Sequence, residues 1–293
     1  MKSKTLTIFT PTYNRAYILP QLYESLVAQT SKDFVWLIVD DGSTDHTKEI
    51  VNQWQQDGKI IIAYYYQTNG GKQRAMNFGF EKASTELFNC VDSDDYMTRT
   101  AIEDIIDFWN KHKSDDIAGI ISLRGKSESK PLTNSYLPKN QKSIHFFELY
   151  EKYGFKGDTN LTYRTDILKE YPYHVFSGEK FIGESVQYLQ IDDYYRMLLM
   201  NEICVICDYR SDGYTQNVAR LLKNNPQGYR YLKGLDYQHS QTIKKKCAEM
   251  IKYCCASYMC HDHKGLMLAP AKFMYFLFYL PGLLCYFMFY RKA

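Results

Sequence analysis

Residues 35–45 read Val-Trp-Leu-Ile-Val-Asp-Asp-Gly-Ser-Thr-Asp, an apolar run that becomes polar at Asp40. The apolar part is short and rich in β-branched and aromatic residues, so it predicts a buried strand over residues 35–39. Two carboxylates, a glycine and small hydroxyl residues follow, and these favour a tight turn and a helix N-cap. The stretch therefore predicts a strand that carries acidic side chains to the edge of a sheet.

Apolar runs of the same kind lie on both sides of this stretch, with helical periodicity between them. The first run ends at Pro11, which we expect to stop its strand. The predicted strands are residues 6–10, 60–66 and 87–91, and the predicted helices carry apolar stripes within 18–26, 50–54 and 75–80. Because crossover helices join parallel strands, this alternation predicts an open, mostly parallel α/β sheet whose ligands lie beyond the carboxyl ends of the strands.

The middle of the chain continues this pattern less regularly. A polar stretch over residues 125–142 predicts a surface loop. Around it we expect further elements of the same domain: a helix through 102–109, a strand at 117–123, a strand at 161–164, a helix around 183–200 and a strand at 203–209.

The chain becomes basic and helical from Asn217 onward and ends in an uncharged, aromatic run over residues 273–290. As a helix rising about 1.5 Å per residue, this run would reach roughly 27 Å, slightly less than the hydrocarbon core of a bilayer. Pro281 would kink it midway. Basic residues flank the run, so we expect shallow insertion or a re-entrant hairpin at a membrane surface. A helical pair packed on the catalytic domain is the alternative.

Composition narrows the classes of partner. The formal charge of +3 is small against 36 basic and 33 acidic residues, which argues against a nucleic-acid partner. The 27 Tyr and 16 Phe exceed what a core requires and favour sugar stacking or a membrane interface, although drift in base composition also produces such an excess.

The eight cysteines show no regular spacing, and the first residues lack the apolar core of a signal peptide. We therefore expect a cytoplasmic protein with reduced thiols, peripheral at the inner face of the cell membrane. A metal site is conceivable where cysteine and histidine cluster, but ordinary helix packing explains the cluster better. Its members are Cys254, Cys255, Cys260, His261 and His263.

Acidic residues also follow the fourth predicted strand, in the sequence Asp92-Ser93-Asp94-Asp95. Clustered carboxylates repel one another unless something neutralises them. A hard divalent cation held by one or two carboxylates and by substrate phosphates would do so. Taken alone, the motif also fits a turn with solvated acids.

Four segments match a known pattern in both order and spacing. They are Thr10-Pro-Thr-Tyr-Asn14, Val39-Asp-Asp-Gly-Ser43, Asn69-Gly-Gly-Lys72 and Asp92-Ser-Asp94. Together they resemble the family 2 inverting glycosyltransferases with the GT-A fold. The resemblance is strong over residues 5–100, weaker over 155–216 and absent beyond. It implies a Rossmann-like, mixed and mostly parallel sheet flanked by helices.

The resemblance also implies which residues contact a nucleotide sugar. They are Pro11, Thr12, Tyr13, Asn14, Asp40, Asp41, Lys72, Asp92 and Ser93. Asp41 would contact the base, and Lys72 would approach the diphosphate unless it is only a solvated lysine at a helix start. Asp92 would touch the ribose or the metal-bound donor, and Asp94 would hold Mg²⁺ or Mn²⁺.

Inverting transfer needs a general base that takes the proton of the acceptor hydroxyl. Residues 177–185 resemble the family's acidic motif after the acceptor loop, which implies Glu184 as the base. The chain departs here from the commoner Glu-Asp pair, so a helix-cap role for Glu184 stays open. The reserve candidates are Glu179, Asp192 and Asp193. In the later loop over 209–215, Arg210 would face the phosphates or form a surface ion pair.

The resulting prediction is a GT-A catalytic domain over residues 1–216, with a nucleotide-sugar half near 1–124, an acceptor half near 140–216, and a helical, membrane-associating extension over 217–293. It would move a sugar, from a UDP-sugar by default, to a saccharide or lipid-linked saccharide acceptor in surface polysaccharide synthesis. A non-catalytic binding or partner subunit of an active transferase is the alternative. A nucleotidyltransferase is disfavoured because its N-terminal phosphate loop is missing.

Overall fold

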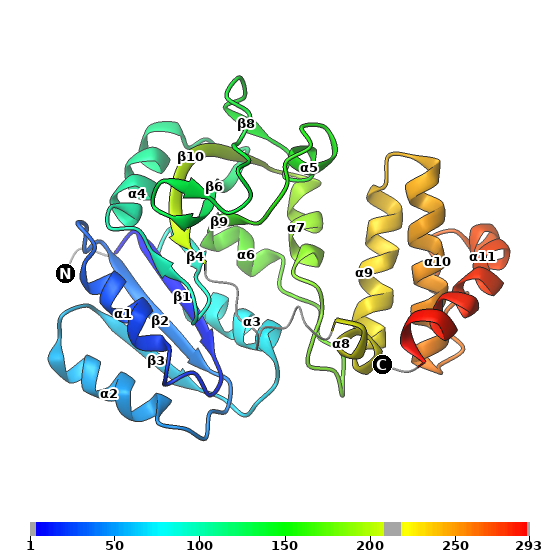
Figure 1. Ribbon diagram of the computed structural model, residues 1–293, viewed down its shortest axis with the longest axis horizontal. Helices are drawn as coiled ribbons and strands as arrows, with labels where there is room; N and C mark the ends of the chain where they lie inside the picture. The colour runs from blue at the N-terminus through cyan, green and yellow to red at the C-terminus, as the bar shows by residue number, and fades with distance from the viewer. Residues whose placement is uncertain (1–3, 208–217, 292–293) are drawn as a thin grey trace. The chain divides into compact units, whose positions relative to one another are not determined.

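The structure, a computed structural model, describes residues 4–207 and 218–291. Figure 1 shows strands alternating with helices in the first part of the chain and helices in the last part. The elements are β1 Leu6–Thr12, α1 Leu19–Val27, β2 Phe34–Asp40, α2 Thr47–Asp57, β3 Ile62–Tyr66, α3 Lys72–Lys82, β4 Leu87–Cys90, β5 Tyr96–Met97, α4 Ala101–His112, β6 Ile117–Ser127, β7 Lys130–Pro131, β8 Ser143–Ile144, α5 Glu148–Glu151, β9 Thr159–Arg164, α6 Thr165–Glu170, α7 Ser185–Asp192, β10 Arg196–Ile206, α8 Val218–Asn224, α9 Pro226–His239, α10 Ile243–Cys260, α11 Lys272–Cys285 and the π-helical turn η2 Tyr286–Tyr290.

The chain divides into two compact units. The first comprises Met1–Pro172 and Gln190–Tyr209, and the second comprises Tyr173–Leu189 and Arg210–Ala293. The first unit contains the sheet and the loops at the ends of its strands. The second contains the helices α8 to α11 together with residues 173–189, which include the first part of α7.

One mixed sheet of ten strands forms the first unit, in the order β3-β2-β1-β4-β9-β6-β10-β5, with β7 paired to β6 and β8 to β10. The pairs β1–β2, β1–β4, β2–β3 and β6–β10 are parallel, whereas β9 runs antiparallel to both of its neighbours. The predicted mostly parallel α/β sheet flanked by helices is confirmed. Because β9 runs opposite to β4 and β6, those two strands share one direction, and their carboxyl ends lie at the same edge.

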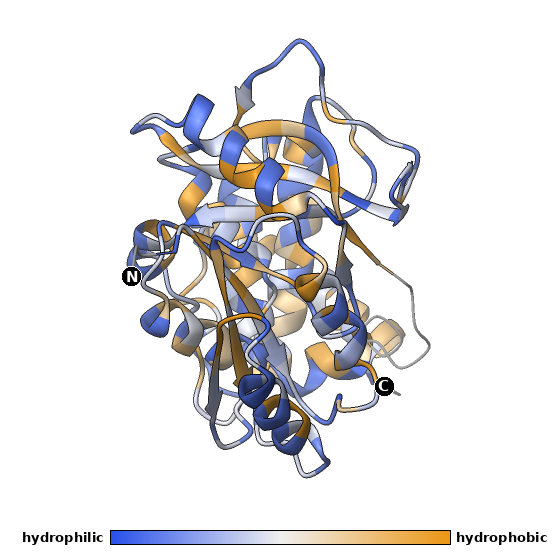
Figure 2. Ribbon diagram, turned by 90° about the vertical axis from the view of Figure 1, so that its left-hand side faces the viewer, coloured by the Kyte–Doolittle hydropathy of each residue, from blue (hydrophilic) through white to orange (hydrophobic). Residues whose placement is uncertain are grey.

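The side chains of β1 alternate between the two faces of the sheet, and helices cover both faces. Leu6 and Ile8 belong to a buried cluster with residues of α1, α2 and α4. Phe9 points to the opposite face, where its ring stacks on Phe88 at 5.1 Å between centroids and lies against Gly79 of α3. In Figure 2 the apolar colour is concentrated on the strands, as expected for a sheet that is buried on both faces.

Pro11 does not stop the first strand, contrary to our expectation. β1 continues to Thr12, and Pro11 pairs in register with Val39 of β2. The backbone N–H of Val91 donates to the carbonyl of Phe9, so residues 9 and 11 face β4, which ends at Cys90. A missing N–H at Pro11 therefore removes no ladder hydrogen bond.

Two other predictions in the middle of the chain are wrong. Part of the expected loop over 125–142 is a hairpin, because β6 extends to Ser127 and pairs with β7, while Leu132 and Leu137 are buried. The expected helix over 183–200 ends at Asp192, and the strand β10 begins at Arg196. Met197 to Met200 are all buried, and such a run does not distinguish a strand from a buried helix.

Candidate functional site

The carboxyl ends of three parallel strands lie side by side at one edge of the sheet. Thr12 of β1 is in register with Asp40 of β2, and Asp40 is in register with Tyr66 of β3. β4 ends next to β1 at the same edge. The loops that contain the four sequence motifs therefore converge, as the parallel arrangement predicts.

Asp41 organises the loop that follows β3. Its Oδ1 accepts hydrogen bonds from Gln67 Nε2 at 2.6 Å and from the N–H of Gly70 at 2.8 Å, and its Oδ2 accepts from the N–H of Gly71 at 2.8 Å. The Asn69 side chain donates to the Asp41 carbonyl at 2.9 Å. Both carboxylate oxygens are thus bonded within the protein, and the role of Asp41 in base contact stays a prediction.

Gly42 brings the same two loops into close contact. Its φ is +90°, and an added Cβ would lie 2.8 Å from the backbone nitrogen of Asn69. Both the backbone conformation and the lack of space exclude a larger residue.

Asp40 and Asn14 connect the first two loops. Asp40 is fully buried and accepts hydrogen bonds from Tyr64 Oη and from the N–H of Ser43, both at 2.7 Å. The N–H of Asn14 donates to Ser43 Oγ, and Asn14 Oδ1 accepts from the N–H of Thr44, both at 2.8 Å. These two predicted site residues therefore support the loops. Tyr13 lies beside them with about half of its side chain exposed.

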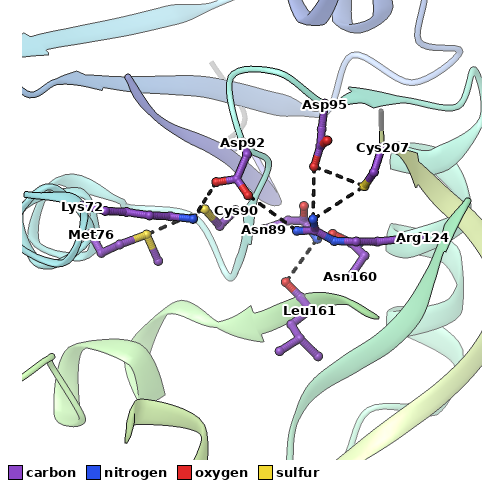
Figure 3. Close-up of polar contacts among 10 residues, drawn as sticks. All are labelled: Lys72, Met76, Asn89, Cys90, Asp92, Asp95, Arg124, Asn160, Leu161 and Cys207. Atoms are coloured by element: carbon purple, nitrogen blue, oxygen red, sulfur yellow. Dashed lines mark hydrogen bonds and ion pairs between the residues drawn. The ribbon is translucent and has the colours of Figure 1, made fainter. Parts of the chain in front are cut away.

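Lys72, at the start of α3, joins the fourth motif directly. Its Nζ lies 2.7 Å from Asp92 Oδ1, and both side chains are partly exposed (Figure 3). Burial alone would raise the pKa of Asp92, but Lys72 and Arg124 outweigh burial and hold that pKa below its usual value. Asp92 is consequently an anion at neutral pH, and Lys72 is positioned at the same edge as the acidic loop.

Arg124 is a residue of this edge that sequence reasoning missed. It lies on β6, where its Nη1 is 3.1 Å from Asp95 Oδ2 and its Nη2 is 3.9 Å from Asp92 Oδ2. Its Nη1 also donates to the sulfur of Cys207, whose thiol donates to Asp95 (Figure 3). Burial raises the pKa of Asp95 to about 6, although Arg124 opposes the rise. The available signal was an arginine directly after the predicted strand 117–123.

Among the carboxylates of the acidic loop, Asp94 is the one most available to bind a divalent cation. Asp94 is partly exposed, and its side chain forms no hydrogen bond or ion pair with any described residue, whereas Asp92 and Asp95 are both paired with cations. Ser93, between Asp92 and Asp94, is buried. Within residues 4–207 and 218–291 no group of three or more His, Cys, Asp or Glu is arranged to hold a metal ion. A cation here would therefore use Asp94 and substrate phosphates, the arrangement typical of Mg²⁺ sites.

The candidates for the general base lie elsewhere in the chain. Glu184 and Glu179 belong to the second unit, where the Glu179 carboxylate accepts from the N–H groups of Gln227 and Gly228 at the start of α9. Asp192, in the first unit, accepts from the N–H groups of Phe146 and Phe147. Two of the reserve candidates, Glu179 and Asp192, thus accept backbone hydrogen bonds within the protein. The catalytic roles of Glu184 and of the exposed Asp193 stay predictions. Arg210 lies outside the described residues.

Residues 7–172 match the sequence profile of glycosyl transferase family 2, over more than half of the chain. The chain belongs to glycosyl transferase family 2. The match covers the four loops at the edge of the sheet, so the predicted family resemblance is confirmed where the motifs lie.

Curated relatives in this family are bacterial glycosyltransferases. An uncharacterized glycosyltransferase of Nostoc sp. is 25% identical over 171 residues, which cover 56% of this chain and 52% of the relative. The poly(ribitol-phosphate) beta-N-acetylglucosaminyltransferase TarS of Staphylococcus aureus is 30% identical over 121 residues, covering 41% of this chain and 21% of TarS. The chain thus matches about half or less of the length of these relatives.

Solved structures of other glycosyltransferases share the fold over nearly the whole chain. S. aureus TarS 1–349 in complex with UDP-GlcNAc has a TM-score of 0.59 at 18% identity, covering 97% of this chain and 92% of that structure. The mannosyltransferase PcManGT of Pyrobaculum calidifontis, in complex with GDP-Man and Mn²⁺, has a TM-score of 0.59 at 14% identity, covering 98% and 82%. At these identities the likeness establishes the GT-A fold alone.

Proposed function

We propose that this protein transfers a sugar from a nucleotide sugar, with a UDP-sugar as the favoured donor, to a saccharide or lipid-linked saccharide acceptor in surface polysaccharide synthesis. The observation that carries the proposal is the convergence of four loops at one sheet edge, where Lys72 lies 2.7 Å from Asp92. Membership of family 2 supports it. The UDP-GlcNAc complex of TarS supports the choice of donor.

The edge offers distinct groups for each part of the donor. Tyr13 presents an exposed ring, which suits stacking on a nucleobase. Lys72 presents its ammonium group beside the acidic loop, where a diphosphate would compete with Asp92 for it. Arg124 holds Asp92 and Asp95 in fixed positions through its guanidinium. We assign nucleoside binding to the Tyr13 loop, diphosphate binding to Lys72, and positioning of the carboxylates to Arg124.

Asp94 is the residue that we expect to hold Mg²⁺ or Mn²⁺. A divalent cation bound there neutralises charge on the departing nucleoside diphosphate. Two distant structural neighbours were solved with Mn²⁺, namely PcManGT with GDP-Man and GalNAc-T7 with UDP and GalNAc. Glu184 is proposed to take the proton of the attacking acceptor hydroxyl, so that a single displacement inverts the anomeric carbon.

A mass-spectrometric screen of UDP-, GDP- and dTDP-sugars tests this proposal. We expect release of one nucleoside diphosphate with Mn²⁺ or Mg²⁺ and none with excess chelator. Asp94→Ala should lower the release by about a hundredfold or more, because it removes a charge that acts on the leaving group. Asp107→Ala, at an exposed position of α4, is the matched control and should act like the wild type.

Two outcomes would contradict the proposal. Near-normal turnover by Asp94→Ala would remove the metal role from this residue. Binding of a nucleotide sugar without turnover of any donor would favour the alternative, a non-catalytic partner subunit of an active transferase.

A further inference from the structure

One side of α11 and of the turn η2 is strongly apolar and exposed. We define the apolar face as Phe273, Phe276, Leu277, Leu280, Leu284 and Met288, whose side chains are between 57% and 78% exposed. Spacings of three and four residues place these side chains on the same side of one helix. Monomeric soluble proteins rarely expose such a continuous apolar surface without a partner.

The opposite side of α11 is fixed on α10. An added Cβ at Gly282 would lie 2.4 Å from the Cβ of Cys254, which shows how closely the two helices approach. The Tyr275 ring packs edge-on against Tyr253, and the Cys254 thiol donates to the carbonyl of Tyr275. Protein therefore covers one side of α11, and the apolar face on the other side is exposed to solvent.

The charge around this helix fits an anionic partner. Residues 263–293 contain four basic residues and no acidic residue. Lys264 and Lys272 precede the apolar face, and Arg291 follows it. An apolar face of aromatic, leucine and methionine side chains with basic residues at both ends matches the boundary between acyl chains and anionic head groups.

We infer that α11 docks in the plane of an anionic lipid membrane and inserts its apolar face into the acyl boundary. Lys272–Tyr290 is long and apolar enough to cross a bilayer by length and composition, and 11% of its apolar window is buried. To cross, however, α11 would have to leave α10 and expose the buried Tyr253 and Cys254. In-plane docking keeps this packing, and it does not depend on sugar transfer.

Co-sedimentation of the full chain with vesicles tests the docking. We expect binding to phosphatidylcholine vesicles that contain phosphatidylglycerol, and weaker binding to phosphatidylcholine alone. The double variant Phe276→Ser/Leu280→Ser should lower the ratio of bound to free protein by more than about tenfold, because full burial of each side chain contributes about a factor of ten. Both positions are exposed, so thermal unfolding should be unchanged. The matched control is Ile61→Ser/Tyr194→Ser, two exposed apolar positions of the first unit.

The inference is overturned if the wild type stays in the supernatant with anionic vesicles, or if the double variant binds as the wild type does. A second copy of the chain is the rival occupant. It would appear in analytical ultracentrifugation as a dimer that the double variant dissociates, together with a lack of vesicle binding.

A native thiol pair separates in-plane docking from a membrane span. Cys285 of α11 packs against the buried cluster that contains Cys255 of α10. With copper–phenanthroline and oxygen as the oxidant, these thiols should form a disulfide equally well in solution and on vesicles, read by mass spectrometry of the linked peptides. Loss of this link only in the vesicle-bound protein would mean that α11 leaves α10, which would overturn the in-plane geometry.

Discussion

Asp41 tests the site geometry most directly, because both oxygens of its carboxylate accept hydrogen bonds from within the protein. Its Oδ1 accepts hydrogen bonds from Gln67 and Gly70, its Oδ2 accepts one from Gly71, and the residue is 5% exposed. The resemblance to the family instead implies contact with a nucleobase. The substitutions Asp41→Asn and Asp41→Ala distinguish the two roles.

The expected loss of stability follows from the donors left without an acceptor. An asparagine keeps one acceptor oxygen, so at least one backbone N–H of Gly70 or Gly71 would face an amide NH₂ instead. A buried donor without a partner costs about 1–3 kcal/mol, so we expect Asp41→Asn to lower the free energy of unfolding by about 2 kcal/mol. Asp41→Ala leaves both backbone donors without acceptors, while the partly exposed Gln67 turns to water, so about 3 kcal/mol is expected.

Urea unfolding followed by tryptophan fluorescence measures this loss. All three tryptophans, Trp36, Trp54 and Trp109, lie in the core of the first unit and report on its unfolding. Asp107→Asn, on the exposed side of α4, should change the free energy of unfolding by less than about 0.5 kcal/mol. If Asp41→Asn unfolds like the wild type yet loses UDP binding in calorimetry, the stabilising role of the Asp41 hydrogen bonds is refuted and Asp41 contacts the base.

Three further predictions concern other parts of the molecule. Glu184→Gln should bind UDP normally and lose sugar transfer in a steady-state assay, whereas full activity would move the general base elsewhere. Lys72→Met should weaken UDP binding by about tenfold or more in calorimetry, because it removes a charged donor from the edge; unchanged affinity would exclude diphosphate contact. Two hydrogen bonds from the Arg230 guanidinium lower the pKa of Asp262 to about 2. The ionised Asp262 therefore stabilises the fold above its usual pKa of 3.8, and this stabilisation is lost as the pH falls toward 2. Acid unfolding followed by circular dichroism measures this effect. Above pH 4, the free energy of unfolding of the wild type should exceed that of Asp262→Asn by about 1 kcal/mol, a figure that allows for solvent screening. Near pH 2 the two proteins should be equally stable.

The parallel half of the sheet could be predicted from the sequence because its strands are short apolar runs that end in polar turns. Residues 35–39 and 87–91 have this form, and each prediction lies within one residue of β2 and β4 at either end. The region after residue 180 could not be predicted in the same way. There the buried run Met197–Met200 fits a helix and a strand equally well, and only its pairing with β6 decides.

The site was predictable to the extent that it follows strands. Lys72 and Asp92 are each marked by a local motif, and the structure brings them together. Arg124 carries no such local signal, because its partner Asp95 is 29 residues earlier and meets it only when β6 joins the sheet. Long-range ion pairs of this kind depend on strand order, which alternation alone does not fix.

The balance of charge at this edge explains why a cation is central to the catalytic interpretation. Within the part of the chain that the structure describes, the acidic loop presents Asp92, Asp94 and Asp95, and the cations that act on Asp92 are Lys72, Arg124 and the nearby Arg15. Because equal numbers of opposite charges largely cancel, a diphosphate gains little net attraction from these side chains. We therefore expect UDP to bind weakly in chelator and tightly with Mn²⁺. Equal affinity in both conditions would mean that side chains alone neutralise the diphosphate, and the assignment of Asp94 would lose its physical basis.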